Sequence, residues 1–383
     1  MTMEESGILK LVDSAVDEVV GSIVEREFLS GNLKAFCSMS SNLLRLMPQI
    51  PIKEHRTIYQ KLLKLKILEN TPQFLTAVDW NQSFIETEGS IELLKQSSVI
   101  ISFHLGAFRS FEMLLVRHNI NIVFVVDTSV YDIDSIRKVL LSNLELSKTL
   151  FKGSSSQMEV LAADSSDTVI RLLSFIQKGY SVGLYVDWNS GMKNEEQNVS
   201  IPFLNETISV RQGPAYLSYF TGIPILPITC SINDNYEIRW KIHQAIFPDK
   251  MKPINQYAVE SLSYVFGILG DLLLSYFDQW QGWLHIHKYL INIDTTEFFP
   301  LFEYSTGMAL EVSPYVGLFV LSDNNFIMNR LTGKIVRVNR KIYENLSTTE
   351  NEVVSLDCSD DEKRGRVIWR RQPTVTQLSS DYV

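Results

Sequence analysis

The hydrophobic positions of the first 95 residues recur at intervals of three and four. Residues 8–19 and 58–65 carry this pattern, and Pro48 and Pro51 lie between them. Such spacing places apolar side chains on one face of an α-helix, whereas proline interrupts helices. We therefore expect a helical N-terminal region over residues 1–95, broken near the two prolines.

After residue 95 the pattern changes to short, continuous hydrophobic runs. A polar cluster at residues 164–167 is a good start for a helix that reaches Gln177, and Gly179 then ends it. Strands that alternate with helices at this spacing predict an α/β core over residues 96–300, with a mostly parallel central sheet flanked by helices. Four runs have the length of buried strands: residues 99–101, 122–126, 181–186 and 224–228.

The last part of the chain, residues 301–383, has a different texture. Three strand candidates, at residues 317–321, 325–328 and 334–338, are separated by turn-prone polar stretches. We expect a small β-rich C-terminal domain built on this meander. Residues 347–364 are polar and charged, and we expect a loose tail from Gln372 onward.

Composition narrows the class of protein. The 383 residues suffice for two domains, or for one large domain with an appendage. The 35 basic and 44 acidic residues give a net charge of −9, which argues against nucleic acid as a general partner. Three widely spaced cysteines, Cys37, Cys230 and Cys358, fit a reducing compartment and predict neither a disulfide framework nor a metal site.

The chain offers no clear membrane-spanning segment. Its N-terminus is acidic and amphipathic, unlike a signal peptide. The most apolar helical stretch, residues 259–277, is interrupted by Glu260, Asp271 and three serines. We therefore expect a cytoplasmic protein.

The most informative segment for chemistry is residues 99–109. A buried strand leads directly to His104, and Gly106 then opens a helix. In open α/β sheets, ligands bind at this edge of the sheet, where an imidazole can accept a proton near neutral pH. The alternative is a histidine that caps the helix or packs beneath it.

The residues around His104 resemble a known family. His104-Leu105-Gly106-Ala107-Phe108 is similar to the His-Leu-Gly-Asn-Trp-Glu block of the bacterial lipid A biosynthesis acyltransferases, within the lysophospholipid acyltransferase superfamily. Further blocks follow in the order of that family, at residues 183–189, 201–205, 213–215, 222–228 and 278–285.

This resemblance implies acyl transfer without a covalent enzyme intermediate. His104 would take a proton from an acceptor hydroxyl or amine, which attacks a thioester of acyl carrier protein or coenzyme A. The co-substrate is then a phosphopantetheine or CoA thioester, and no bound cofactor or metal is needed. The resemblance also implies substrate-binding roles for Gly106, Phe108, Phe203 and Gly213.

The sequence departs from the family at two charged positions. The family carries Glu or Asp five residues after the histidine, where this chain has Arg109, and an arginine at the end of the next strand, where it has Asp127. With the two strands side by side, Asp127 would orient His104 while Arg109 binds substrate or pairs with Asp127. The alternative is a decayed motif in which Arg109 and Asp127 form a plain ion pair. Glu112 is a further candidate carboxylate.

Two other charged residues have open roles. Asp187 follows the third strand and either orients the histidine or an acceptor amine, or caps the following loop. Arg211 is expected to start the helix that carries Gly213, where it either meets a phosphopantetheine phosphate or is simply solvated. His285 and His287 alternate beside two tryptophans, which is more typical of a strand than of a metal site.

The C-terminal meander resembles PqqD-like peptide-binding modules over residues 325–339. Such modules recruit a peptide by adding it as a strand at a sheet edge. Together the observations favour a soluble acyltransferase with a small-molecule or peptide acceptor. The alternatives are a catalytically silent acyl- or peptide-binding protein and a peripheral membrane lipid acyltransferase.

Overall fold

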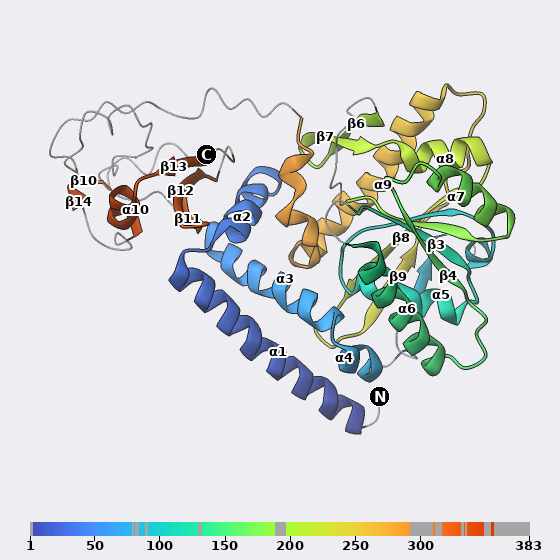
Figure 1. Cartoon of the computed structure of the whole chain (residues 1–383), viewed down its shortest axis with the longest axis horizontal. Helices are drawn as coiled ribbons and strands as arrows, with labels where there is room; N and C mark the ends of the chain where they lie inside the picture. The colour runs from blue at the N-terminus through green and yellow to red at the C-terminus, as the bar shows by residue number, and fades with distance from the viewer. Residues whose placement is uncertain are drawn as a thin grey trace. The chain divides into compact units, whose positions relative to one another are not determined.

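We describe the protein from a computed structural model (Figure 1). The description covers residues 3–78, 80, 84–88, 91–128, 132–187, 197–291, 309–310, 316–330, 333, 335–347 and 354–355. The expected C-terminal tail and Cys358 lie outside these residues.

The chain divides into two compact units. Unit 1 comprises residues 1–20, 60–282 and 288–291, and unit 2 comprises residues 21–59, 283–287 and 292–383. The expected division into three consecutive segments, at residues 95 and 300, differs from this one. The reason is that the N-terminal helices are shared between the two units instead of forming a region of their own.

A seven-stranded sheet forms the centre of unit 1, in the order β1-β9-β8-β2-β5-β3-β4. Neighbouring strands run parallel throughout, except for the antiparallel pair β8–β9. The expected α/β fold with a mostly parallel sheet is therefore confirmed. The strands are β1 (Phe84–Thr87), β2 (Val99–Ser102), β3 (Ile122–Val126), β4 (Met158–Ala162), β5 (Ser181–Tyr185), β8 (Ile225–Ile232) and β9 (Ile238–Ile242).

Helices cover both sides of this sheet (Figure 1). The central strands β2 and β8 are buried along their whole length, which explains their continuous hydrophobic runs. The covering helices are α5 (Phe111–Arg117), α6 (Ile133–Leu150), α7 (Thr168–Gln177), α8 (Gly213–Thr221) and α9 (Ile254–Tyr276).

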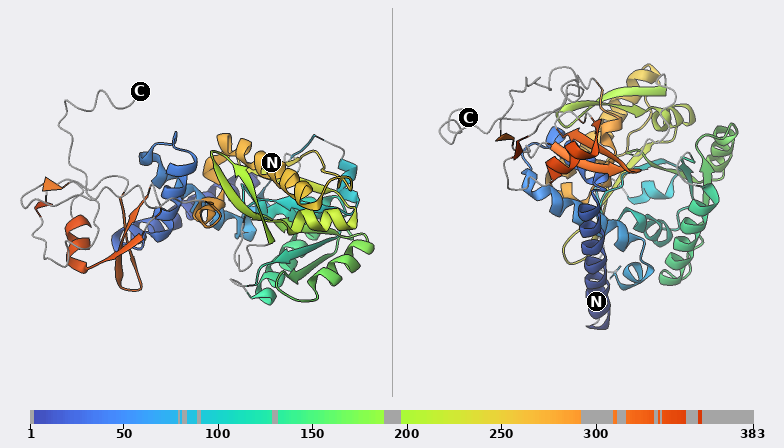
Figure 2. Two further views of the ribbon diagram at one scale, coloured as in Figure 1. Left: turned by 90° about the horizontal axis from the view of Figure 1, so that it is seen from above. Right: turned by 60° about the vertical axis from the view of Figure 1, so that its left-hand side comes forward.

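Helix α9 lies against an antiparallel hairpin, β6 (Asn198–Phe203) and β7 (Glu206–Arg211) (Figure 2). By length and composition, Ile254–Gln279 is the one described helical stretch that qualifies as a membrane span. Its buried residues, among them Leu262, Phe266 and Leu269, pack within unit 1, where α9 also contacts α8 and β8. One face of α9 is thus buried against these elements, whereas Tyr264 and Leu274 of the same helix are exposed.

The remaining elements include the predicted meander, which is confirmed in unit 2. Its strands are β11 (Val316–Leu321), β12 (Asn324–Asn329) and β13 (Ile335–Val338), all antiparallel. Gly317 permits the close packing of β11 on α2 (Lys34–Leu46), because a Cβ there would lie 2.7 Å from Sγ of Cys37. The other elements are α1 (Met3–Ser30), η1 (Ile52–Glu54), α3 (His55–Glu69), α4 (Pro72–Ala77), η2 (Ile91–Lys95), α10 (Arg340–Ser347) and the pair β10 (Ala309–Leu310) and β14 (Val354–Ser355).

Candidate active site

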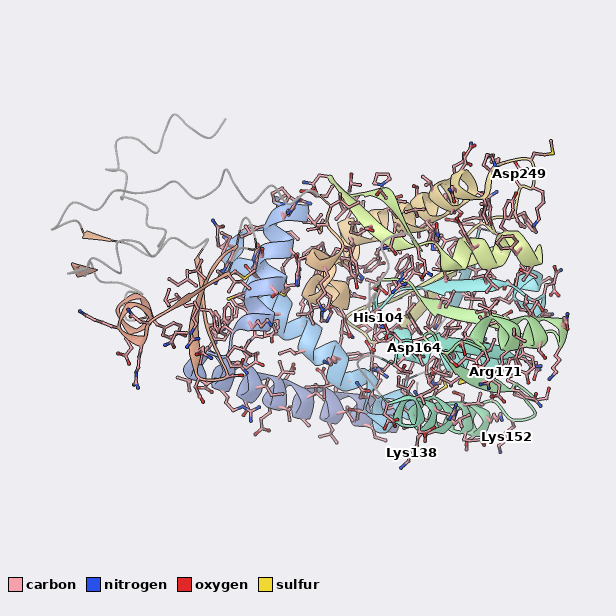
Figure 3. All side chains as sticks on the ribbon, turned by 45° about the horizontal axis from the view of Figure 1, so that its top comes forward. His104, Lys138, Lys152, Asp164, Arg171 and Asp249 are labelled. Atoms are coloured by element: carbon pink, nitrogen blue, oxygen red, sulfur yellow. The ribbon has the colours of Figure 1, made fainter. Side chains whose placement is uncertain are left out.

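His104 lies at the carboxyl edge of the sheet, two residues after β2 ends at Ser102. Figure 3 shows His104 and Asp164, which follow β2 and β4, toward one edge of the sheet, whereas Lys152 and Asp249 lie toward the other. The His104 side chain is 17% exposed, so the imidazole is neither enclosed in the core nor fully solvated. This position agrees with the expectation for a strand-end histidine in an open α/β sheet.

Backbone contacts hold the turn after β2. Gln281 donates its N–H to the His104 carbonyl at 2.9 Å, and Gly106 donates to the Gln279 carbonyl at 3.2 Å. Gly106 has a φ of +60°, and a Cβ there would lie 2.8 Å from the Cys230 carbonyl oxygen on β8. The structure therefore gives Gly106 a backbone role, because only glycine allows this turn so close to β8.

The partner of His104 is Asp187. Its Oδ1 lies 2.8 Å from Nδ1 of His104, and its Oδ2 accepts from the His104 backbone N–H, also at 2.8 Å. Trp280 Nε1 donates to the same Oδ2 at 2.7 Å. The Asp187 side chain is fully buried, and its two oxygens accept hydrogen bonds from these three N–H groups of the protein.

Strand order explains why Asp187 meets the histidine. Strand β5 pairs directly with β2, and Val186 donates its N–H to the Ser102 carbonyl at 3.2 Å beyond the strand ends. The next residue, Asp187, is thereby brought beside His104. A carboxylate can only accept, so Nδ1 carries the proton and Nε2 is left as the basic nitrogen of the ring.

The expected exchange between Asp127 and Arg109 is wrong in its geometry. Asp127 follows β3, and β5 lies between β3 and β2, so the two strands are not neighbours. Arg109 Nε instead lies 4.0 Å from Oε2 of Glu69, and the described residues form no Arg109–Asp127 ion pair. The physical reason is that β2 and β3, although close in sequence, are separated in the sheet by β5.

Aromatic rings surround the imidazole. The centroid of the buried Phe108 ring lies 4.7 Å from that of His104, edge to face, and the Tyr185 ring lies 4.9 Å away. The Tyr185 hydroxyl donates to the Phe108 carbonyl at 3.2 Å, which links the end of β5 to the segment that follows β2. Phe108, expected to bind substrate, therefore also fixes the orientation of the ring next to it.

Phe203, Arg211 and Gly213 are placed differently from one another. Phe203 is buried and packs its ring 5.7 Å from that of Trp280, so it supports the residue that donates to Asp187. Arg211 ends strand β7 instead of starting a helix, and its guanidinium lies 3.3 Å from Oε1 of Gln197. Helix α8 begins at Gly213, where an added Cβ would meet nothing within 4 Å.

Two further titratable groups near the site are buried: the carboxyl of Glu112 and the thiol of Cys230. Burial raises the pKa of Glu112 to about 7 and raises the pKa of the Cys230 thiol well above its usual value. Glu112 forms no hydrogen bond or ion pair with His104, and a thiol with a raised pKa is a poor nucleophile. Among the described residues, no group of three or more His, Cys, Asp or Glu side chains is placed to hold a metal ion.

Sequence reasoning missed the part played by Trp280 and by the segment around it. The resemblance of residues 278–285 to the family block is the one signal for it in the sequence. The segment is not the expected strand: it folds as the 3-10 helices η5 (Phe277–Gln279), η6 (Gln281–Leu284) and η7 (Ile286–Lys288). Glu69 had no signal in the sequence, because it occupies an ordinary position at the end of α3.

Comparisons with known proteins give a similarity in structure but none in sequence. No family model matches the chain, and no curated protein matches its sequence. Among solved structures the chain is similar to the 1-acyl-sn-glycerophosphate (LPA) acyltransferase PlsC from Thermotoga maritima, with a TM-score of 0.31 and 12% sequence identity. The similarity covers 72% of this chain and 100% of that chain. A likeness of this extent assigns no activity.

Proposed function

We propose that this protein is an acyltransferase. It moves an acyl group from a thioester of acyl carrier protein or coenzyme A to a hydroxyl or amine of a non-lipid acceptor, with His104 as general base. The observation that carries the proposal is the hydrogen bond between His104 Nδ1 and the buried Asp187 carboxylate, at 2.8 Å. A histidine held in this way has the protonation pattern that a general base needs.

In the proposed reaction, Nε2 of His104 accepts the proton of the acceptor hydroxyl or amine as that group attacks the thioester carbonyl. The tetrahedral intermediate then collapses, the carbon–sulfur bond breaks, and the imidazolium returns the proton to the departing thiolate. Asp187 stays ionised throughout and stabilises the imidazolium. Direct transfer also fits the two described cysteines, because burial raises the pKa of both Cys37 and Cys230.

The resemblance in the sequence supports the same reading. Three of its blocks contribute one residue each to a single hydrogen-bonded cluster: His104 after β2, Asp187 after β5, and Trp280 between η5 and η6. Asp187 lies 83 positions after His104 and 93 positions before Trp280 along the chain, and it forms a hydrogen bond with each of them. That three separate sequence blocks each place a residue in the same cluster supports a common function for them.

The test is a transfer assay that does not presuppose the acceptor. The purified protein is incubated with acyl-CoA or acyl carrier protein and a panel of amines and alcohols, and products are identified by mass spectrometry. His104→Gln should reduce turnover at least ~100-fold, because general-base catalysis contributes about that much or more. His118→Gln is the matched control: it removes a half-buried histidine that follows α5 and should keep turnover within about twofold of the parent.

Each outcome decides something. Full activity of His104→Gln, with a melting temperature equal to that of the parent, ends the assignment of the base. Tight binding of the acyl donor without turnover in the parent protein favours the catalytically silent binding protein instead. Activity confined to lysophospholipid acceptors in vesicles would favour the lipid acyltransferase.

A further inference from the structure

Arg109 lies near the candidate base with unused hydrogen-bond donors. Its side chain is 35% exposed, and its Nε lies 4.0 Å from Oε2 of Glu69. A guanidinium has five N–H donors, and a contact of this length is too long to be a hydrogen bond. Within the described part of the chain, the guanidinium of Arg109 therefore donates no hydrogen bond, and its donors can meet a ligand.

Two buried carboxyl groups interact with Arg109 but favour their neutral forms, which leaves much of its charge uncompensated. Glu69 and Glu112 are both buried, and neither oxygen of Glu69 has a hydrogen-bond partner. Burial raises the pKa of Glu69 well above its usual value and that of Glu112 to about 7, which favours their neutral forms. A guanidinium, by contrast, stays charged throughout the physiological range. The result is a partly exposed cation next to two groups that resist ionisation.

This cation is close to the base. The guanidinium carbon of Arg109 lies 5.5 Å from the centroid of the Phe108 ring, and that centroid lies 4.7 Å from the centroid of His104. The guanidinium and the imidazole are therefore at most about 10 Å apart, and both contact the same aromatic ring. A molecule of a few bonds in length can reach both groups.

We propose that Arg109 binds an anionic group of the acceptor, a carboxylate or a phosphate, and thereby places the acceptor's hydroxyl or amine at Nε2 of His104. This inference rests on the proposed acyl transfer and adds the chemical class of the acceptor: a small molecule or chain terminus that carries its anion a few bonds from its nucleophile. A guanidinium matches both anions, because its paired N–H groups bind planar and tetrahedral oxyanions with two parallel hydrogen bonds.

The donor's own phosphate does not fit this position. A phosphopantetheine arm has about 13 bonds between sulfur and phosphorus and spans roughly 15 Å when extended at ~1.2 Å per bond. With the thioester at His104, an extended arm places its phosphate about 15 Å from the base. The guanidinium of Arg109 is nearer than that, at most about 10 Å from the imidazole. The anion at Arg109 therefore belongs to the acceptor.

The kinetic test uses pairs of acceptors that differ only in an anion: glycine against glycinamide, and O-phosphoethanolamine against ethanolamine. The parent should prefer the anionic member, and Arg109→Gln should lose about 10- to 100-fold of that preference through KM. Arg109→Gln should prefer acyl-phosphopantetheine over acyl-pantetheine as a donor to the same extent as the parent protein does. An equal effect on the donor pair would overturn the assignment to the acceptor, and an unchanged acceptor preference would overturn the proposal.

A binding test keeps this proposal separate from the proposed function. Acetate and inorganic phosphate are titrated into the parent protein while the Nε–H signal of Arg109, identified by its loss in Arg109→Gln, is followed by NMR. We expect a saturable shift in the parent even if no acyl transfer is found. If acyl transfer occurs but shows no preference for anionic acceptors, and the NMR signal does not shift, the proposed acyltransferase function is kept and the anion site at Arg109 is rejected.

Two matched variants complete the test. Arg117→Gln removes an exposed arginine at the end of α5, whose guanidinium donates to the Trp80 carbonyl, and should change neither readout. Glu69→Gln should leave anion affinity within about twofold of the parent, since a neutral carboxyl is replaced by a neutral amide. A tenfold gain in Glu69→Gln would mean that Glu69 neutralises Arg109 in the free protein, which contradicts the uncompensated cation.

Discussion

Replacing Asp187 with asparagine tests the candidate site most directly, because the two side chains have the same shape and differ in what they donate and accept. The Asp187 oxygens serve three N–H groups, at 2.7 Å for Trp280 Nε1 and at 2.8 Å for the backbone and Nδ1 of His104. Asparagine has one acceptor oxygen and one NH₂ group, so it can satisfy only one side of this arrangement.

The two orientations of the asparagine have different costs. With its oxygen in the place of Oδ2, it accepts from the backbone of His104 and from Trp280, and its NH₂ faces Nδ1. The opposite orientation turns the NH₂ toward two buried N–H groups, which costs about 2–6 kcal/mol at ~1–3 kcal/mol for each unsatisfied donor. The first orientation therefore prevails, and it requires Nδ1 to be the acceptor and Nε2 to carry the proton.

The imidazole of Asp187→Asn is then in the wrong tautomer for a base at Nε2. The cost of returning to the active tautomer, about 2–6 kcal/mol, corresponds to a loss of roughly 30-fold to 10⁴-fold in turnover. A similar replacement in serine proteases lowers turnover by about 10⁴, which is consistent with the upper end. Stability should fall by no more than ~1–3 kcal/mol, the usual effect of losing one charged hydrogen bond.

Turnover with saturating donor and ¹⁵N NMR of the imidazole measure the two consequences separately. Asp127→Asn is the matched control: its position follows β3, which β5 separates from β2, so turnover and tautomer should stay close to those of the parent. The reasoning is refuted if Asp187→Asn keeps the Nδ1-protonated tautomer and turnover within about threefold of the parent. A larger loss in Asp127→Asn than in Asp187→Asn would return Asp127 to the role that the sequence offered it.

Two further predictions concern stability. Burial raises the pKa of Glu112 from its ordinary value of 4.5 to about 7, so the folded state disfavours the carboxylate as the pH rises between these values. Glu112→Gln should therefore add about 3 kcal/mol to the free energy of unfolding at pH 8 and nearly nothing at pH 4, as measured by urea denaturation; a gain that is equal at both pH values would contradict the burial argument. Gly106→Ala should cost roughly 2–4 kcal/mol, because the added Cβ would lie 2.8 Å from the backbone of β8 at a φ of +60°. Gly153→Ala, with φ +91° and nothing within 4 Å, is its control in thermal unfolding, and equal losses for the two variants would show that the contact with β8 carries no cost.

Much of the local structure could be predicted from the sequence. The buried runs became β2, β3, β5 and β8, the N-terminal periodicity became helices, and the C-terminal runs became the antiparallel meander. Position along a strand was predictable as well, because His104 follows a buried run and precedes a glycine that opens a turn. These features depend on residues near one another in the chain, and their patterns reflect local burial and backbone preference.

The partners of the site residues depended on the order of the strands, which the tertiary structure alone decided. A run such as residues 122–126 shows that a strand is buried on both faces but carries no record of its neighbours in the sheet. The insertion of β5 between β2 and β3 therefore gave His104 the carboxylate of Asp187 instead of that of Asp127. In the same way, the burial of Glu69 beside Arg109 arises from packing between segments 40 residues apart, where no local pattern could reveal it.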